Sequence, residues 1–88
     1  MDSILPGEGA IKVKVLFFGP LAEIIGQRDI ELSLLSGTTV GQLVERLDLE
    51  SMLSEGLLIA INGEIGADSE VILRDSSEVA FLPPVSGG

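Results

Sequence analysis

The fold of this chain is decided by a stretch near its middle, Thr39-Val40-Gly41-Gln42-Leu43-Val44-Glu45-Arg46-Leu47. Its apolar residues recur at helical spacing and predict one apolar stripe: Val40, Leu43, Val44 and Leu47. Thr39 and Gln42 have the spacing of a capping box, in which each side chain accepts a backbone N–H at the start of the helix. We therefore expect this stretch to form the main helix.

Alternating or continuous apolar runs on both sides of this helix predict strands. The expected strands are residues 11–18, 30–34, 57–61, 71–73 and 78–82, of which 71–73 is a short edge strand. A short helix is expected at 21–25, and a polar connection that can hold one helical turn at 48–56. The Asn62-Gly63 pair after the third run is the strongest short signal for a β-hairpin.

This order of elements predicts an α+β domain, in which the main helix packs across one face of a mixed sheet. Two strands followed by a helix that crosses the sheet is the order of the β-grasp, the architecture of ubiquitin. A chain of 88 residues allows one domain. We expect this domain at 11–82, a flexible N-terminal arm at 1–10 and an extended tail at 83–88.

The composition excludes several classes of function. The chain has no cysteine and no histidine, which excludes catalysis by a cysteine nucleophile or a histidine base and argues against a metal site. Its net charge of −9 argues against nucleic acid or an anionic membrane as partner and favours a basic protein surface. The lack of cysteine, of a signal peptide and of a long apolar segment predicts a cytoplasmic protein.

The candidate for chemistry is the C-terminus, Pro83-Pro84-Val85-Ser86-Gly87-Gly88. Gly87 and Gly88 carry no side chain and suit a channel only a backbone wide. The two prolines remove backbone donors and favour a tail that leaves the sheet. The carboxylate of Gly88 is a poor electrophile until it is activated, for example as an acyl-adenylate. A glycine end without function is the alternative that the motif by itself leaves open.

A second candidate is an apolar surface near the start of the tail. Phe18 lies on the face of its strand that also carries two lysines, opposite the core face. If the last strand pairs with the first, Leu82 lies beside Phe18, and Ile65 joins them from the hairpin. An exposed patch of this kind suits a protein partner. The alternative is that the same residues point inward, because phenylalanine is usually buried.

Two segments resemble the small subunit of molybdopterin synthase. The first is Val13-Lys14-Val15-Leu16-Phe17-Phe18 with the following Leu21-Ala22-Glu23-Ile24-Ile25-Gly26, and the second runs from Asp75 to Gly88. The most specific element is the ending Pro-Pro-Val-Ser-Gly-Gly after a Glu-Val-Ala-Phe strand. The resemblance covers residues 11–88. Ala22 differs from the arginine of many relatives, and residues 1–10 have no counterpart in the shortest members.

This resemblance implies a β-grasp sulfur carrier for molybdenum cofactor biosynthesis, with the catalytic residues on its partners. The last glycine, here Gly88, would be adenylated by an E1-like enzyme that uses ATP and then converted to a thiocarboxylate. The carrier would bind the large synthase subunit in a heterotetramer and insert its tail there. Sulfur would pass to cyclic pyranopterin monophosphate, which becomes molybdopterin. No cofactor is expected on the carrier itself, and Phe18, Ile65 and Leu82 match apolar contact positions of the interface.

Three alternatives remain open at this point. A sulfur carrier of thiamine synthesis shares the Gly-Gly end and the fold, although the Pro-Pro-Val-Ser approach favours molybdopterin. A ubiquitin-like protein modifier would be conjugated to lysines through Gly88. A plain interaction module would have an inert tail.

Overall fold

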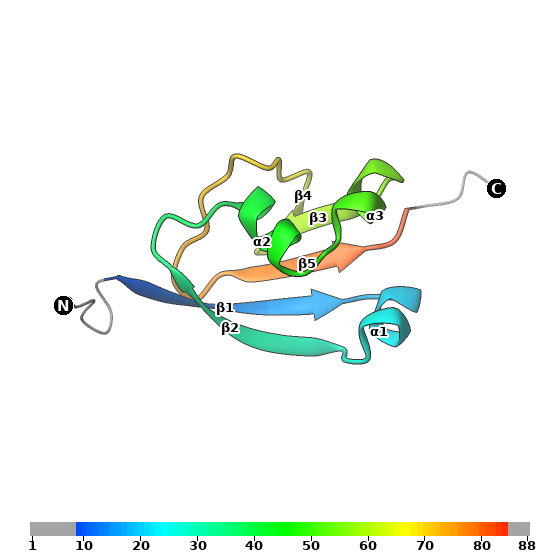
Figure 1. Ribbon diagram of the computed structural model, residues 1–88, viewed down its shortest axis with the longest axis horizontal. Helices are drawn as coiled ribbons and strands as arrows, with labels where there is room; N and C mark the ends of the chain where they lie inside the picture. Colours follow the sequence, from blue (N-terminus) through cyan, green and yellow to red (C-terminus); the bar gives the residue numbers. More distant parts are fainter. Residues whose placement is uncertain (1–8, 85–88) are drawn as a thin grey trace.

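Five strands form one mixed sheet in the computed structural model, which describes residues 9–84 (Figure 1). The strands are β1 (Ala10–Phe17), β2 (Asp29–Leu35), β3 (Leu58–Ile61), β4 (Glu64–Ile65) and β5 (Glu78–Leu82). Their order across the sheet is β2-β1-β5-β3-β4, with β1 and β5 parallel and the other neighbours antiparallel. The last strand in the sequence therefore lies at the centre of the sheet.

Helix α2 (Val40–Arg46) is the helix that the capping box predicts. The Thr39 hydroxyl accepts the Gln42 N–H at 3.2 Å, and the Gln42 side-chain oxygen accepts the Thr39 N–H at 3.0 Å. Two shorter helices, α1 (Pro20–Ile25) and α3 (Glu50–Ser54), lie at the end of the molecule where β5 leaves the sheet (Figure 1). Helix α3 occupies the region that was expected to be a polar connection with one helical turn.

The core lies between one face of the sheet and α2, and it is almost entirely aliphatic. On β1 and β5 every second side chain is buried in it, as the alternation of the sequence predicts: Ile11, Val13, Val15, Phe17, Val79 and Phe81. Helix α2 contributes three buried side chains: Val40, Leu43 and Val44. The predicted α+β arrangement, with one main helix across a mixed sheet, is confirmed, and it has the strand and helix order of the β-grasp.

The predicted hairpin at Asn62-Gly63 is also present. Both residues have positive φ, 50° and 89°, as a two-residue type I′ turn requires. The Asn62 side-chain oxygen accepts the Glu78 N–H at 2.9 Å, and the Asn62 N–H donates to the Glu78 carbonyl at 2.8 Å. The turn is therefore tied to the start of β5 as well as joining β3 to β4.

The expected edge strand at 71–73 is a wrong prediction. This segment makes one isolated bridge, between Thr39 and Ile72, and forms no strand of the sheet. Carbonyl groups in and just before this segment bond instead to the start of α2: the Val71 carbonyl accepts the Val40 N–H and the Ser69 carbonyl accepts the Gly41 N–H, both at 2.9 Å. The first N–H groups of a helix have no partner within the helix, so here they bond to carbonyl groups that a neighbouring strand would otherwise use.

The boundary between the expected N-terminal arm and the domain shifts by one residue. Strand β1 begins at Ala10, which pairs with Leu35, so the arm expected at 1–10 is too long by one residue. Residues 1–8 lie outside the described part of the chain. The expected tail at 83–88 is described for Pro83 and Pro84.

Candidate functional site

Strand β5 ends at Leu82, and the two prolines of the predicted tail follow it directly. The Phe18 N–H donates to the Phe81 carbonyl at 3.1 Å, one residue before the strand ends. Pro83 and Pro84 have no N–H to donate, so the ladder of hydrogen bonds cannot continue through them. Pro83 is half-buried and Pro84 is exposed, so the chain reaches the surface here. The remaining predicted tail residues lie outside the described part of the chain: Val85, Ser86, Gly87 and Gly88.

The face of the sheet opposite the core carries an apolar patch beside this exit. Residues that pair across neighbouring strands share a face, so the register of the strands gives two apolar rows. The first row crosses four strands: Leu16, Ala80, Ala60 and Ile65. The second row lies nearer the exit: Leu82 pairs with Leu58, and Phe18 lies beside Leu82 because it is the next residue after the Phe17–Phe81 pair. These two rows together are named the outer-face patch, and with strands about 4.8 Å apart the first row spans about 14 Å.

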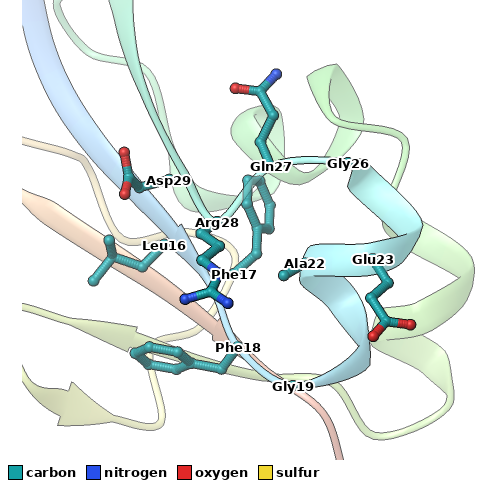
Figure 2. A pocket seen from close by; sticks show the side chains of 10 residues that line it. All are labelled: Leu16, Phe17, Phe18, Gly19, Ala22, Glu23, Gly26, Gln27, Arg28 and Asp29. Atoms are coloured by element: carbon teal, nitrogen blue, oxygen red, sulfur yellow. The ribbon is translucent and has the colours of Figure 1, made fainter.

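The three residues predicted as a partner interface all lie in the outer-face patch. Phe18 is 45% exposed and Ile65 is 62% exposed, while Leu82 is half-buried. Figure 2 shows that Leu16 and Phe18 extend to one side of β1 and that Phe17 extends to the other. None of the three predicted residues belongs to the core, so the inward orientation is wrong for them. Their part in binding a partner stays a prediction.

Four members of the patch were not predicted as interface residues: Leu16, Leu58, Ala60 and Ala80. The alternation of side chains along β1 and β5 was signal enough for Leu16 and Ala80, because they share a face with Phe18 and Leu82. Strand β3 is different, since its continuous apolar run does not tell which side chains face the core. Only the antiparallel register with β5 assigns Leu58 and Ala60 to the patch.

A polar and charged band borders the outer-face patch on the same face of the sheet. In the row next to the patch, Lys14 pairs with Glu31 of β2 on one side and with Glu78 of β5 on the other. Lys12 pairs with Ser33 one row farther from the exit. This band separates the outer-face patch from the apolar pair Ala10 and Leu35 at the far end of the sheet. A partner that buries the outer-face patch approaches the root of the tail.

A depression in the surface borders the patch at Phe18 (Figure 2). It lies between α1 and the start of β2, and its charged lining residues are Glu23, Arg28 and Asp29. Within residues 9–84, no group of three Asp, Glu, His or Cys side chains is placed to hold a metal ion. In the same part of the chain, no helix has the length and hydrophobicity needed to span a membrane.

The comparison with known proteins decides the family. The model described as the ThiS family matches residues 15–88, from the middle of β1 to the last residue. The chain belongs to the ThiS family. This ThiS-family chain is also 36% identical, over 83 residues, to a protein of Mycobacterium tuberculosis (strain ATCC 25618 / H37Rv) named molybdopterin synthase sulfur carrier subunit. That match covers 89% of this chain and 99% of the relative.

Two solved structures share the ThiS-family fold. SAMP1 from Haloferax volcanii is 29% identical with a TM-score of 0.72, and the match covers 88% of this chain and 99% of that one. A chain in the complex of subunits 1 and 2 of molybdopterin-converting factor from Helicobacter pylori 26695 is 27% identical with a TM-score of 0.63. That match covers 89% of this chain and all of the other. The resemblance to the molybdopterin synthase small subunit and the β-grasp fold are both confirmed.

Proposed function

We propose that this chain is the sulfur carrier subunit of a molybdopterin synthase. The observation that carries the proposal is the position of the outer-face patch directly beside the exit of β5, which leads into the Gly-Gly end. A partner that binds the patch receives the root of the tail at a defined place. The names of the curated relatives support the pathway.

The reacting group of the proposed carrier is the carboxylate of Gly88. On an E1-like activating enzyme, a carboxylate oxygen attacks the α-phosphorus of ATP, which releases pyrophosphate and leaves an acyl-adenylate. Hydrosulfide from the sulfur donor then attacks the carbonyl carbon, AMP leaves, and a thiocarboxylate remains. ATP is bound by the partner in the cytoplasm, and the carrier itself needs no cofactor.

The second half of the proposed reaction takes place on the large synthase subunit. Val85, Ser86 and Gly87 lead the thiocarboxylate into that subunit's active site, where sulfur passes to cyclic pyranopterin monophosphate to form molybdopterin. Pro83 and Pro84 have restricted backbones, which lowers the entropy lost when the root of the tail is held by a partner. Catalytic side chains are assigned to the large subunit because the carrier has no cysteine and no histidine. The solved complex of two molybdopterin-converting factor subunits supports this partner.

Mass spectrometry tests the proposal. The full chain is incubated with its activating enzyme, ATP and a sulfur donor, and the intact mass is measured. We expect replacement of one terminal oxygen by sulfur, and we expect the product to support molybdopterin formation with the large subunit. Deletion of Gly88 abolishes both results while the circular dichroism spectrum stays unchanged. A folded chain without Gly88 that still supports molybdopterin formation would refute the proposal.

A protein modifier is the second candidate, because one solved relative at 29% identity is titled a small archaeal modifier protein 1, from Methanosarcina acetivorans. A modifier would form adducts between Gly88 and lysine side chains of other proteins in a cell extract. A carrier for thiamine synthesis would give the same thiocarboxylate but would not support molybdopterin formation with the large synthase subunit. Lysine adducts in a cell extract, the thiocarboxylate mass and molybdopterin formation together distinguish the three functions.

A further inference from the structure

Two glycines lie against the two prolines at the exit of β5. Gly19 follows β1 and Gly56 precedes β3. Strands β1 and β3 are the two neighbours of β5 in the sheet. A Cβ atom added at Gly19 would lie 3.2 Å from Cγ of Pro83, and one added at Gly56 would lie 3.1 Å from Cβ of Pro84. Carbon atoms in favourable contact are about 3.5–4.0 Å apart, so any side chain at either glycine would displace a proline ring.

Backbone conformation by itself does not account for these two close approaches. Several other glycines also have positive φ, and a Cβ added to them would meet nothing within 4 Å: Gly26, Gly37, Gly63 and Gly66. Gly56 and Gly66 even share the same φ of 107°. At those other positions the turn explains the glycine, whereas at Gly19 and Gly56 the missing side chain also leaves room for a proline of the tail.

We propose that Gly19 and Gly56 are positioning residues, which set the direction in which Pro83 and Pro84 carry the tail away from the sheet. The two glycines flank the root from the β1 side and the β3 side, so a side chain at Gly19 would push the root away from β1 and one at Gly56 would push it away from β3. This inference rests on the proposed function, since direction matters only if a partner must receive the Gly88 carboxylate.

The effect at the reacting group is larger than the displacement at the root. Gly88 is the fourth residue after Pro84, and four residues reach at most about 14 Å. Where a partner holds the tail extended, a shift of a few tenths of an ångström in a proline ring would tilt the root and displace the carboxylate by on the order of 1 Å. Misplacement of a reacting group by about 1 Å can lower a rate about a hundredfold.

The test measures adenylation of the full chain by the activating enzyme of the same organism, as exchange of pyrophosphate into ATP. We expect Gly56→Ala and Gly19→Ala to lower kcat by roughly ten- to a hundredfold, with KM for the chain changed by about twofold or less. We expect KM to be preserved because neither substitution alters a residue of the outer-face patch, on which the activating enzyme is also expected to dock. The control is Gly37→Ala. Gly37 has a positive φ of 93°, an added Cβ there would meet nothing within 4 Å, and it follows Leu35, which pairs with Ala10 at the end of β1 away from the exit.

A double-mutant cycle separates the contact from backbone strain. Pro83→Ala removes the ring atoms that a side chain at Gly19 would meet, so the kcat of Gly19→Ala/Pro83→Ala should equal that of Pro83→Ala. If the kcat loss of the double variant instead equals the product of the two single-variant losses, the role of Gly19 is overturned. Equal kcat for Gly56→Ala and Gly37→Ala would overturn the role of Gly56. Circular dichroism checks that each variant folds. Should Gly56→Ala unfold, the proposal is tested by the double-mutant cycle of Gly19 and Pro83. No exchange with the unaltered chain would overturn the proposed function and this inference together.

Discussion

Truncation of Ile65 in the outer-face patch provides a direct test of the docking surface. Ile65 is 62% exposed on the two-residue strand β4, so Ile65→Ala removes few contacts within the free chain. We expect the free energy of unfolding to change by no more than about 0.5 kcal/mol. The loss should appear instead when a partner covers this side chain.

The size of that loss follows from the exposed area of Ile65. Complete burial of an isoleucine is worth about 1.5–3 kcal/mol. Because 62% of the residue is still accessible in the free chain, a partner that covers it gains about 1–2 kcal/mol from this side chain. Ile65→Ala should therefore raise the Kd for the large synthase subunit by about five- to thirtyfold.

Isothermal titration calorimetry with the large synthase subunit of the same organism measures this Kd. The matched control is Ile72→Ala, because Ile72 is 60% exposed and belongs to the segment that bridges to Thr39, outside the outer-face patch. We expect Ile72→Ala to change the Kd by about twofold or less. Equal losses from the two substitutions, or an unchanged Kd for Ile65→Ala, would refute the assignment of the patch as the docking surface.

Two further predictions concern the stability of the domain, and both are measured by urea unfolding followed by circular dichroism. Leu43→Ala leaves a cavity at a fully buried position of α2 and should lower the free energy of unfolding by about 2–5 kcal/mol; a loss below 1 kcal/mol would contradict the described core. Thr39→Ala removes the hydroxyl that accepts the Gln42 N–H and should cost about 0.5–2 kcal/mol, less than Leu43→Ala; a neutral result would mean that the capping box contributes nothing.

Local features of this chain were predictable because they depend on residues close together in the sequence. The capping box of Thr39 and Gln42 and the type I′ turn at Asn62-Gly63 each need only a few neighbouring residues. The edge strand at 71–73 failed for the opposite reason. Its backbone accepts a hydrogen bond from the start of α2, about thirty residues earlier in the chain, and no local sequence pattern predicts a partner so far away.

The sequence by itself determined which chemistry is available: a chain without cysteine or histidine, an ending in Pro-Pro-Val-Ser-Gly-Gly, and apolar runs that specify strands and one main helix. The tertiary structure alone decided which distant residues meet. Placing β5 between β1 and β3 brings Leu58 and Ala60 into the patch and sets Gly19 and Gly56 against the two prolines. The physical reason is that strand register, which no single segment encodes, assigns every side chain to a face and to its neighbours across the sheet.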